Sequence, residues 1–402
     1  MSKKYDTYAW FYGSDDLNAL KEYFTQLTVR GPKRERGISR EKSMEKDIDS
    51  RYYYFKLKKS ALLNLDHKDD VRTMYRNYLY PELNVKENVK LLGIAEEILK
   101  TFGIVKEFWQ PTNLPIYSAL IQIKFKLKKP YISKDDDEFY IIDNPIVKDK
   151  VFKLPMVRPT TWKGALRFAA IKVFENWVYE KLSKSKLDRE TVFKERAKIV
   201  KLFGNEKDSQ EEYLGKQCLL AIEGELPAGK KLKEEVEKIN KEFETWLIDE
   251  KIISKGIPSR SGRLFFYPTF FEEISLDVIT PLSRETRTPV KGRSPIYFEI
   301  VPENAEGTFR LLYYPFDLIA EGKLDEIERE MENDLEYLKE ALKKMFYEIG
   351  FSAKKSSGFG VVKQIGENDV TVTGFKSEEI RETAISKLCT KVNRTVNDGA
   401  SK

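Results

Sequence analysis

Alternation between apolar and polar side chains marks residues 117–129 as the clearest strand of this chain. Every second residue is apolar (Ala119, Ile121, Ile123, Phe125, Leu127), and most of the residues between them are polar or basic (Gln122, Lys124, Lys126, Lys128). A period of two residues is that of a β-strand with one buried face. The segment is therefore predicted to be half-buried, with a basic face toward solvent.

Apolar residues spaced by three and four positions predict three helical regions. The first begins near Trp162, and its inward stripe recurs at helical spacing (Trp162, Leu166, Ala169, Ala170, Val173, Trp177). Residues 184–255 are mostly helical and contain a seam spaced as in a coiled coil, which is more often a helix on its own core (Leu232, Val236, Ile239, Phe243, Trp246). A third helix is expected from Leu324 to Glu348, ending at Gly350.

The order of these elements predicts an α+β fold. Further strands are expected at residues 263–271, 274–280, 295–301 and 308–314, and a glycine-containing loop at 352–362 precedes the last strand. Strand, helix, strands, helix and a final strand is the order of a ferredoxin-like sandwich. The core is expected to span residues 113–375, with a helical insertion at about 184–255 and a hairpin loop at about 280–293.

Residues 1–112 have a different character and are predicted to be an N-terminal extension. Aromatic strands are expected at Tyr5–Tyr12 and Tyr52–Leu57, and an amphipathic helix at Glu87–Phe102. Residues 30–51 are charge-dense with few apolar side chains, as in a flexible or partner-ordered loop. The extension is expected either to contact a partner or to form a second, degenerate α+β unit. Residues 376–402 are expected to be a C-terminal tail.

Composition excludes several classes of catalytic site. The single histidine, His67, rules out His-based triads, paired-His nucleases and HExxH metalloenzymes. Cys218 and Cys389 have no metal-ligand spacing, so neither a zinc site nor a disulfide framework is supported. No apolar run reaches membrane-spanning length and no signal peptide is recognisable, so a cytoplasmic protein without a membrane partner is expected. The 71 Lys+Arg nearly balance 65 Asp+Glu, so any nucleic-acid site must come from local clustering.

The first such cluster lies at the start of the helix near Trp162. Thr160 or Thr161 is expected to cap the helix, and the cations of the cluster are one turn apart or just before it (Arg158, Lys163, Arg167). The positive end of the helix dipole disfavours cations unless an anion such as a phosphate lies there. The alternative is ordinary capping followed by a solvated helix face.

Two further basic segments are expected to converge with the first if the α+β fold is correct. The hairpin loop carries four cations (Arg284, Arg287, Lys291, Arg293). The glycine-containing loop offers two lysines, two hydroxyls, a glycine whose backbone can approach phosphate and an aromatic ring for base stacking (Lys354, Lys355, Ser356, Ser357, Gly358, Phe359). Each could instead be a solvated turn, but their joint occurrence favours binding of RNA or DNA.

Asp143, in the run Ile-Ile-Asp-Asn-Pro-Ile-Val, is the candidate for catalysis. A carboxylate at a phosphate-facing surface can hold a divalent cation or orient a ribose 2′-hydroxyl. The alternative is an Asx turn before Pro145, which spacing alone favours. The acidic run 135–138 is a second possible cation site, although such runs are usually solvated loop tips.

Several motifs, taken in order, resemble the RAMP superfamily of CRISPR-associated proteins, and more narrowly the backbone subunits of type III effector complexes. The resemblance covers about 116–365. It depends on six sequence motifs that occur in the family's order (Asp143-Asn-Pro-Ile-Val-Lys-Asp149, Leu154-Pro-Met-Val with Thr160-Thr-Trp-Lys-Gly-Ala-Leu-Arg167, Leu202-Phe-Gly-Asn205, Gly262-Arg-Leu-Phe-Phe266, Arg293-Ser-Pro-Ile-Tyr-Phe-Glu-Ile-Val-Pro302, Ser357-Gly-Phe-Gly-Val361). The chain departs from the family where Arg158-Pro-Thr-Thr replaces Gly-Ser-Ser and Trp162 replaces a leucine.

The resemblance implies an RRM-like core that grips the backbone of a CRISPR guide RNA. It implies that the loop 281–293 corresponds to a hairpin that wedges into the guide–target duplex. It further implies that Asp143 supports metal-dependent cleavage of target RNA, with Mg²⁺ or Mn²⁺ as the cation, because no histidine is placed as a general base. Expected partners are guide RNA, target RNA, other RAMP subunits and a polymerase-like large subunit. The alternatives are a non-catalytic structural RAMP subunit and a stand-alone guide-processing RAMP ribonuclease.

Overall fold

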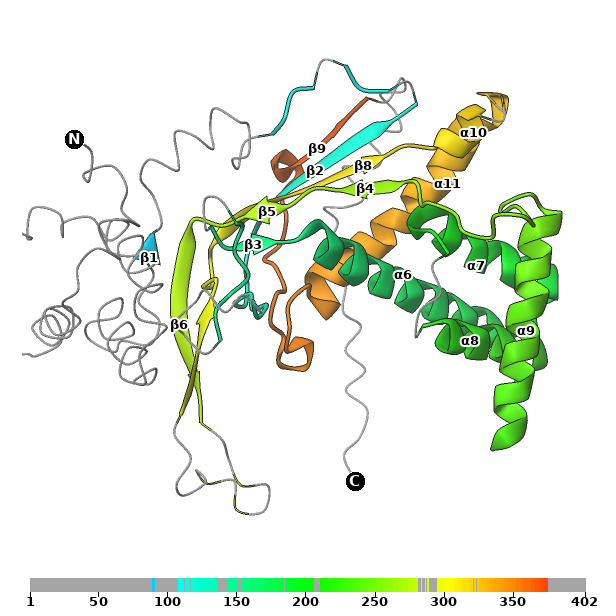
Figure 1. Cartoon of the computed structure of the whole chain (residues 1–402), viewed down its shortest axis with the longest axis horizontal. Coiled ribbons are helices and arrows are strands. Elements are labelled where there is room, and N and C mark those ends of the chain that lie inside the picture. Colours follow the sequence, from blue (N-terminus) through cyan, green and yellow to red (C-terminus); the bar gives the residue numbers. More distant parts are fainter. Residues whose placement is uncertain are drawn as a thin grey trace, which may run out of the picture.

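A four-stranded antiparallel sheet forms the centre of the structure, in the order β4–β8–β2–β9 (Figure 1). Its strands are β2 (Ala119–Lys126), β4 (Leu264–Phe266), β8 (Glu306–Tyr313) and β9 (Val370–Thr373). The structure is a computed structural model that describes residues 89–90, 108–111, 113–115, 117–135, 144–150, 154–183, 185–205, 210–280, 283, 286, 288, 295–320, 322 and 324–374. The fold is a mixture of helices and antiparallel sheet, so the prediction of an α+β protein is confirmed at this level.

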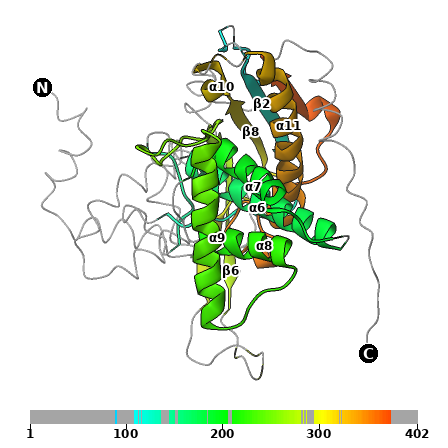
Figure 2. The same ribbon diagram turned by 90° about the vertical axis from the view of Figure 1, so that its right-hand side faces the viewer.

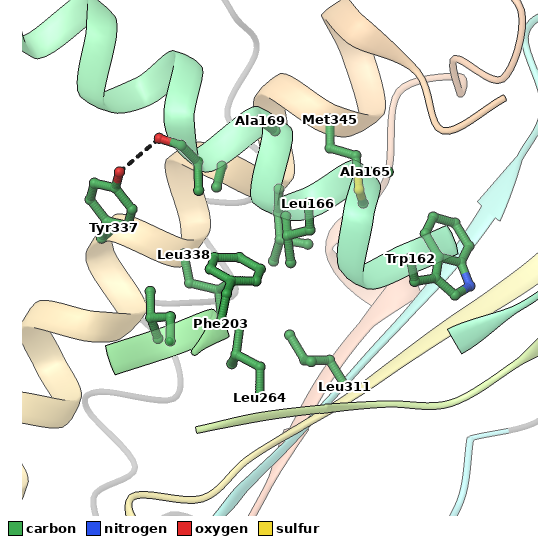
Figure 3. Close-up of a cluster of buried hydrophobic side chains, with 14 of the residues drawn as sticks. Trp162, Ala165, Leu166, Ala169, Phe203, Leu264, Leu311, Tyr337, Leu338 and Met345 are labelled. Atoms are coloured by element: carbon green, nitrogen blue, oxygen red, sulfur yellow. Dashed lines mark hydrogen bonds between the residues drawn. The ribbon is translucent and has the colours of Figure 1, made fainter. Parts of the chain in front are cut away.

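Two helices, α6 (Pro159–Leu182) and α11 (Leu324–Lys343), pack together against one face of this sheet (Figure 1). The alternating apolar side chains of β2 point into the same core, as predicted, and Trp162 of α6 is completely buried there. The Tyr337 hydroxyl of α11 donates a 2.7 Å hydrogen bond to the Ala170 carbonyl of α6 (Figure 3). A six-residue π-helical turn, Lys344–Ile349, extends α11 before the chain turns at Gly350.

Three helices form the insertion that the sequence predicts between α6 and β4. They are α7 (Arg189–Phe203), α8 (Glu211–Glu223) and α9 (Lys230–Asp249), and α9 packs across α7 and α8 (Figure 2). Three residues of the predicted α9 seam are buried (Val236, Ile239, Phe243), and two are half-buried (Leu232, Trp246). Ile239 and Phe243 belong to the main hydrophobic core, so the helix packs on the chain's own core, as expected. A short helix, α10 (Phe316–Ala320), leads into α11.

A hairpin of β6 (Glu273–Ile279) and β7 (Ile296–Ile300) extends away from the central sheet (Figure 1). Strand β1 (Val89–Lys90) pairs with β6, and β3 (Met156–Val157) pairs with β5 (Thr269–Phe270). The prediction of a helix through Glu87–Phe102 is therefore wrong at residues 89–90, because main-chain pairing with β6 overrides their helical periodicity.

The second face of the sheet is covered around Gln122, so the predicted basic face reaches solvent only in its later part, where Lys124 is half-buried and Lys126 and Lys128 are exposed. Gln122 is completely buried, and its side-chain amide makes hydrogen bonds of 2.8 and 3.0 Å with the backbone N–H and carbonyl of Trp109. Arg310, opposite Gln122 on β8, lies 4.5 Å from the centre of a Trp109 ring. Burial lowers the pKa of Arg310 to about 10. Only toward the end of β2 do side chains reach solvent, at Lys126.

A buried cluster of charges joins the edge of the sheet to α10 and α11. Arg263, only 1% exposed, donates to Asp317 (2.6 and 2.9 Å), Asp334 (2.7 Å) and Glu330 (3.1 Å). Burial alone would raise the pKa of Asp317, but the hydrogen bonds and charges of Arg263 and Arg260 outweigh it and lower that pKa to about 2. The planar guanidinium donates to several carboxylates at once, so it fixes the positions of α10 and α11 relative to the sheet.

Several predicted features lie outside the described residues (strands Tyr5–Tyr12 and Tyr52–Leu57, the segment 30–51, the acidic positions 136–138, the tail 376–402). Among the helices that the structure describes, none combines the length and apolarity needed to cross a membrane.

Candidate nucleic-acid interface

The segment 144–149, directly after Asp143 in the sequence, crosses between three other parts of the chain. Backbone hydrogen bonds hold it on each side (Val147 N–H to Ser133 carbonyl, 2.8 Å; Met156 N–H to Val147 carbonyl, 3.0 Å; Glu299 N–H to Asn144 carbonyl, 3.0 Å). These contacts bring together residues far apart in the sequence: the approach to α6 and the strand β7 of the hairpin.

A buried ion pair joins the segment 144–149 to strand β7. The Lys148 ammonium donates to the carboxylate of Glu299 on β7, and both side chains are 0% exposed. The same carboxylate accepts the backbone N–H of Ile146 at 3.2 Å. The backbone N–H of Lys148 donates to the buried carboxylate of Asp135 at 3.3 Å. Opposite charges taken out of water require each other and further hydrogen bonds, and the Ile146 N–H supplies one to the Glu299 oxygen that accepts from Lys148.

The glycine-containing loop lies against the same strand. The Ser352 hydroxyl accepts from the Ile132 N–H (2.7 Å) and donates to the Ile132 carbonyl (2.8 Å), which ties the loop beside the crossing. The Lys354 ammonium lies 4.5 Å from the centre of the Phe298 ring on β7. Phe359, half-buried, packs on the small cluster that contains Ile132 and Phe298.

Two glycines allow this loop to pack closely on the end of the π-helical turn. Gly350 and Gly360 have φ of 78° and 73°. A Cβ at Gly350 would lie 2.5 Å from the Phe359 carbonyl oxygen, and one at Gly360 would lie 2.5 Å from the Ser352 Cβ. By contrast, Gly358 faces open space but donates its N–H to the Lys355 carbonyl within the loop's own turn, so this N–H is not directed outward. The loop offers outward side chains more than free amides.

Helix α6 begins differently from the prediction. Pro159 is its first residue and Arg158 is the N-cap, whose side chain makes no capping hydrogen bond, so neither Thr160 nor Thr161 caps the helix. Proline suits the first helical position because its fixed φ is helical and its missing N–H is not needed there. Thr160 is exposed and Thr161 is half-buried, and the first turn contains no acidic residue.

The start of α6 lies beside the loop because Trp162 packs on Phe351, with ring centres 4.4 Å apart. Farther along α6, the Lys355 ammonium lies 5.1 Å from the centre of the Phe168 ring. Burial lowers the pKa of Lys355, since desolvation disfavours its charged form. A bound anion would stabilise that charge.

The other predicted cations of this region are Arg158, just before α6, and Lys163 and Arg167 within the helix. Arg158 lies 3.6 Å from the carboxylate of Asp135 and is 48% exposed, so it stays next to the crossing. Lys163 is half-buried one turn into the helix. Arg167, one turn further along α6, is half-buried and lines a pocket of the helical insertion, and its role at a nucleic-acid surface stays a prediction.

We call the surface formed by residues 144–149, 158–163, 297–299 and 352–360 the junction. The other predicted site residues lie outside the described residues, and their roles stay predictions (Asp143, Arg284, Arg287, Lys291, Arg293). Within the hairpin loop, the described Ser283 N–H donates to the Thr288 carbonyl at 2.9 Å. Among the described residues, no group of three or more His, Cys, Asp or Glu side chains is arranged to hold a metal ion.

Two residues on which the junction depends were not predicted to have a role there. Glu299 lies in the apolar run of β7, inside the segment Arg293–Pro302 that resembles the RAMP superfamily, and Ser352 follows the turn at Gly350. An isolated acid inside an apolar strand is a weak signal of a buried partner, and here that partner is Lys148.

Comparison with known proteins gives one family match. The model of the RAMP superfamily matches residues 93–363. Among solved structures, the chain is similar to a chain in the cryo-EM structure of the Type III-B Cmr-beta bound to cognate target RNA, with 12% identity and a TM-score of 0.35 over 86% of this chain and 98% of that one. It is also similar to Cmr6 from Pyrococcus furiosus, with 16% identity and a TM-score of 0.28 over 62% and 99% of the two chains. No curated protein sequence matches the chain.

Breaking the buried pair from one side is expected to destabilise the fold more than removing it altogether. Lys148→Met or Glu299→Leu alone leaves a buried charge uncompensated and lowers the free energy of unfolding by about 3–5 kcal/mol. The double variant loses less than either single one. Urea unfolding of the full chain measures all three.

The matched control is the exposed pair Lys126 and Glu306, 2.9 Å apart, where the same substitutions change the free energy of unfolding by less than about 1 kcal/mol. Additive costs for Lys148→Met and Glu299→Leu would contradict a coupled buried pair.

Proposed function

The chain belongs to the RAMP superfamily, and we propose that it is an RNA-binding subunit of a type III CRISPR effector complex that holds the guide RNA on the junction. The observation that carries this proposal is the convergence of the α6 start, the hairpin base and the glycine-containing loop on the segment 144–149. Basic groups from separate parts of the sequence meet on one surface there, as a phosphate backbone requires.

The chemistry of the junction suits single-stranded RNA. Lys354, Lys355 and Arg158 supply cations that can contact phosphates without reading sequence. Phe359, half-buried, supplies a ring on the same loop as Lys354 and Lys355 on which a base can stack. The hydroxyls of Ser356 and Ser357 are on exposed residues and can donate to phosphate oxygens.

We also infer that the core is ferredoxin-like and therefore RRM-like. Two connections that pass through a helix, β2–α6–β4 and β8–α11–β9, combine with the strand order β4–β8–β2–β9 to support this topology. In such a core the outer face of the sheet is a common platform for RNA. Here Trp109 covers that face, which favours the junction as the RNA surface.

Cleavage of target RNA is a second proposal, carried by one contact. The Asn144 side-chain amide donates to the Tyr297 carbonyl at 3.2 Å, so the residue next to Asp143 is fixed at the hairpin. Asp143 would hold Mg²⁺ or Mn²⁺, which supplies charge stabilisation at the scissile phosphate. The carboxylates of Asp135, Asp149 and Glu299 already accept protein hydrogen bonds, so we assign the cation to Asp143 alone.

The proposed partners are guide RNA, target RNA, other RAMP subunits and a polymerase-like large subunit. A non-catalytic structural RAMP subunit would bind guide RNA equally but would not cut target RNA. A stand-alone guide-processing ribonuclease would cut repeat RNA as an isolated chain without metal, and the single histidine, His67, disfavours that reading.

Removing the two lysines of the loop tests RNA binding at the junction. Lys354→Ala with Lys355→Ala is expected to weaken guide-RNA binding at least about tenfold, because charge-assisted phosphate contacts are lost. The slope of log affinity against log salt should fall by about 0.7 per lost contact on single-stranded RNA. Fluorescence anisotropy with labelled guide RNA at several salt concentrations measures both.

Its matched control removes two exposed lysines from α9, Lys231→Ala with Lys233→Ala, which carries the same change in net charge. Equal loss of affinity in both double variants would mean that the RNA responds to the overall positive charge of the protein and not to the lysines of the junction.

Substitution of Asp143 separates cutting from holding. In the assembled complex, Asp143→Asn should lower target-RNA cleavage on the order of 10²–10³-fold, because the cation loses its protein ligand. Guide-RNA affinity should stay within twofold of wild type, roughly the precision of such a titration. Cleavage at the wild-type rate would leave the structural, non-catalytic subunit as the correct description.

A further inference from the structure

A pocket of about 490 Å³ lies in the helical insertion, among α6, α7, α8, α9 and the chain that follows α9. It shares no residue with the junction. Its volume falls within the range of small-molecule sites, which are mostly apolar with a few convergent polar groups. The residues that matter below are four polar side chains of its interior and an aliphatic wall (Arg167, Arg196, Asn205, Asn240; Ile199, Leu214, Leu247, Ile253).

Arg196 is the unusual member of this lining because it is charged and only 4% exposed. One guanidinium nitrogen donates to the Asn240 side-chain oxygen at 2.8 Å, and the group lies 4.1 Å from the centre of the Phe243 ring. The nitrogen that donates to Asn240 also lies 3.8 Å from the Cys218 Sγ. Among the described residues, no ion pair joins Arg196 to a carboxylate, and its buried Nε has no hydrogen-bond acceptor. Burying a cation without an anionic partner is costly, so an anionic ligand in the pocket is favoured.

The packing of α8 on α9 orients the guanidinium. A Cβ at Gly215 would lie 2.8 Å from the Asn240 side-chain oxygen, so only glycine lets Asn240 approach α8 this closely. Asn240 also donates to the Glu211 carbonyl at 3.3 Å, which directs its oxygen toward Arg196. Arg196 is therefore held by a preformed arrangement of amide and ring, as binding sites require.

The charges of the pocket are distributed unevenly. Arg196 is buried, and Arg167 and Glu211 are half-buried, while Glu237, Lys241 and Glu244 are exposed on α9. An anionic group of the ligand is thus attracted to the arginines, and groups that donate hydrogen bonds are attracted to the exposed carboxylates. The aliphatic wall between them suits a flat apolar surface.

We propose that this pocket binds a nucleoside monophosphate unit. The phosphate contacts Arg196 and Arg167, whose planar forks match phosphate oxygens. The base lies on the aliphatic wall, and ribose hydroxyls or exocyclic amines donate to Glu237 and Glu244. The unit is supplied either by a free mononucleotide or by the phosphorylated end of an RNA strand, since both present the same chemistry. The proposal does not depend on RNA binding at the junction.

Isothermal titration calorimetry on the full chain tests the proposal. The probes are AMP, GMP, CMP and UMP, with the corresponding nucleosides and inorganic phosphate for comparison. We expect at least one monophosphate to bind with a Kd in the micromolar range, and its nucleoside to bind at least tenfold more weakly. Arg196→Met should weaken the monophosphate at least tenfold, whereas Lys194→Met, an exposed lysine of the same helix, should not.

Arg167→Met provides a second variant that remains informative if Arg196→Met does not fold, because Arg167 is half-buried and its replacement keeps the apolar stem. It should also weaken the monophosphate severalfold. A trinucleotide with a 5′- or 3′-phosphate, compared with its unphosphorylated form, distinguishes the RNA end from the free nucleotide; tighter binding of either source supports the proposal.

Absence of binding by all four monophosphates overturns the proposal. So does monophosphate binding that survives unchanged in both arginine variants. Tighter binding of an acetylated tetra-glutamate peptide than of any nucleotide overturns it in favour of an acidic partner segment.

Discussion

The buried ion pair between Lys148 and Glu299 is the interaction on which the rest of the junction depends. Two fully buried charges are stable only as a pair, because the attraction between them offsets the cost of removing each from water. The pair therefore fixes the register of segment 144–149 against β7. From that register follow the contacts of Asn144 with Tyr297 and of Ile146 with the same carboxylate. A shift by one residue would turn Lys148 to the opposite side of the segment, away from Glu299, and would break the pair.

The covering of both faces of the sheet decides which surfaces remain for function. Helices α6 and α11 occupy one face, and Trp109 with its hydrogen bonds to Gln122 occupies part of the other. Arg310 is buried by this covering, and its lowered pKa reflects the loss of water around it. The surfaces that remain are the junction at the edge of the fold and the pocket of the helical insertion. The junction includes Lys163 near the start of α6, and the pocket includes Arg167 one turn later.

The periodic spacing of apolar residues predicted the elements whose formation depends on their own sequence. The alternation in β2 identified the side chains that point into the core. The stripe of α6 and the seam of α9 identified part of the buried set, since four of their residues are half-buried (Val173, Trp177, Leu232, Trp246). Prediction failed where distant parts of the chain decide the outcome. Val89–Lys90 form a strand because β6 pairs with them, and Gln122 is buried because Trp109 covers it. No pattern within a single segment reports such contacts.

The candidate site likewise contains features that the sequence predicts and features that depend on distant contacts. The basic and aromatic composition of 354–359 was readable from the sequence, and the loop does lie on the hairpin strand. The capping of α6 was mistaken because Pro159 at the first helical position competes with the threonines that follow it. Arg167 lines the pocket of the helical insertion, which depends on the packing of α6 with α7 and α8 and could not be predicted from the spacing of cations along α6. The partnership of Lys148 with Glu299 could not be derived, because the two are 151 residues apart in the sequence.

Photochemical crosslinking of guide RNA to the full chain, read by mass spectrometry of the adducts, tests the central claim most directly. If RNA lies on the junction, adducts fall on the aromatic and basic residues of 297–299 and 352–360, with Phe359 among them. Adducts concentrated instead on Trp109 and Phe265, on the outer face of the sheet, would contradict the account and assign RNA to the sheet platform.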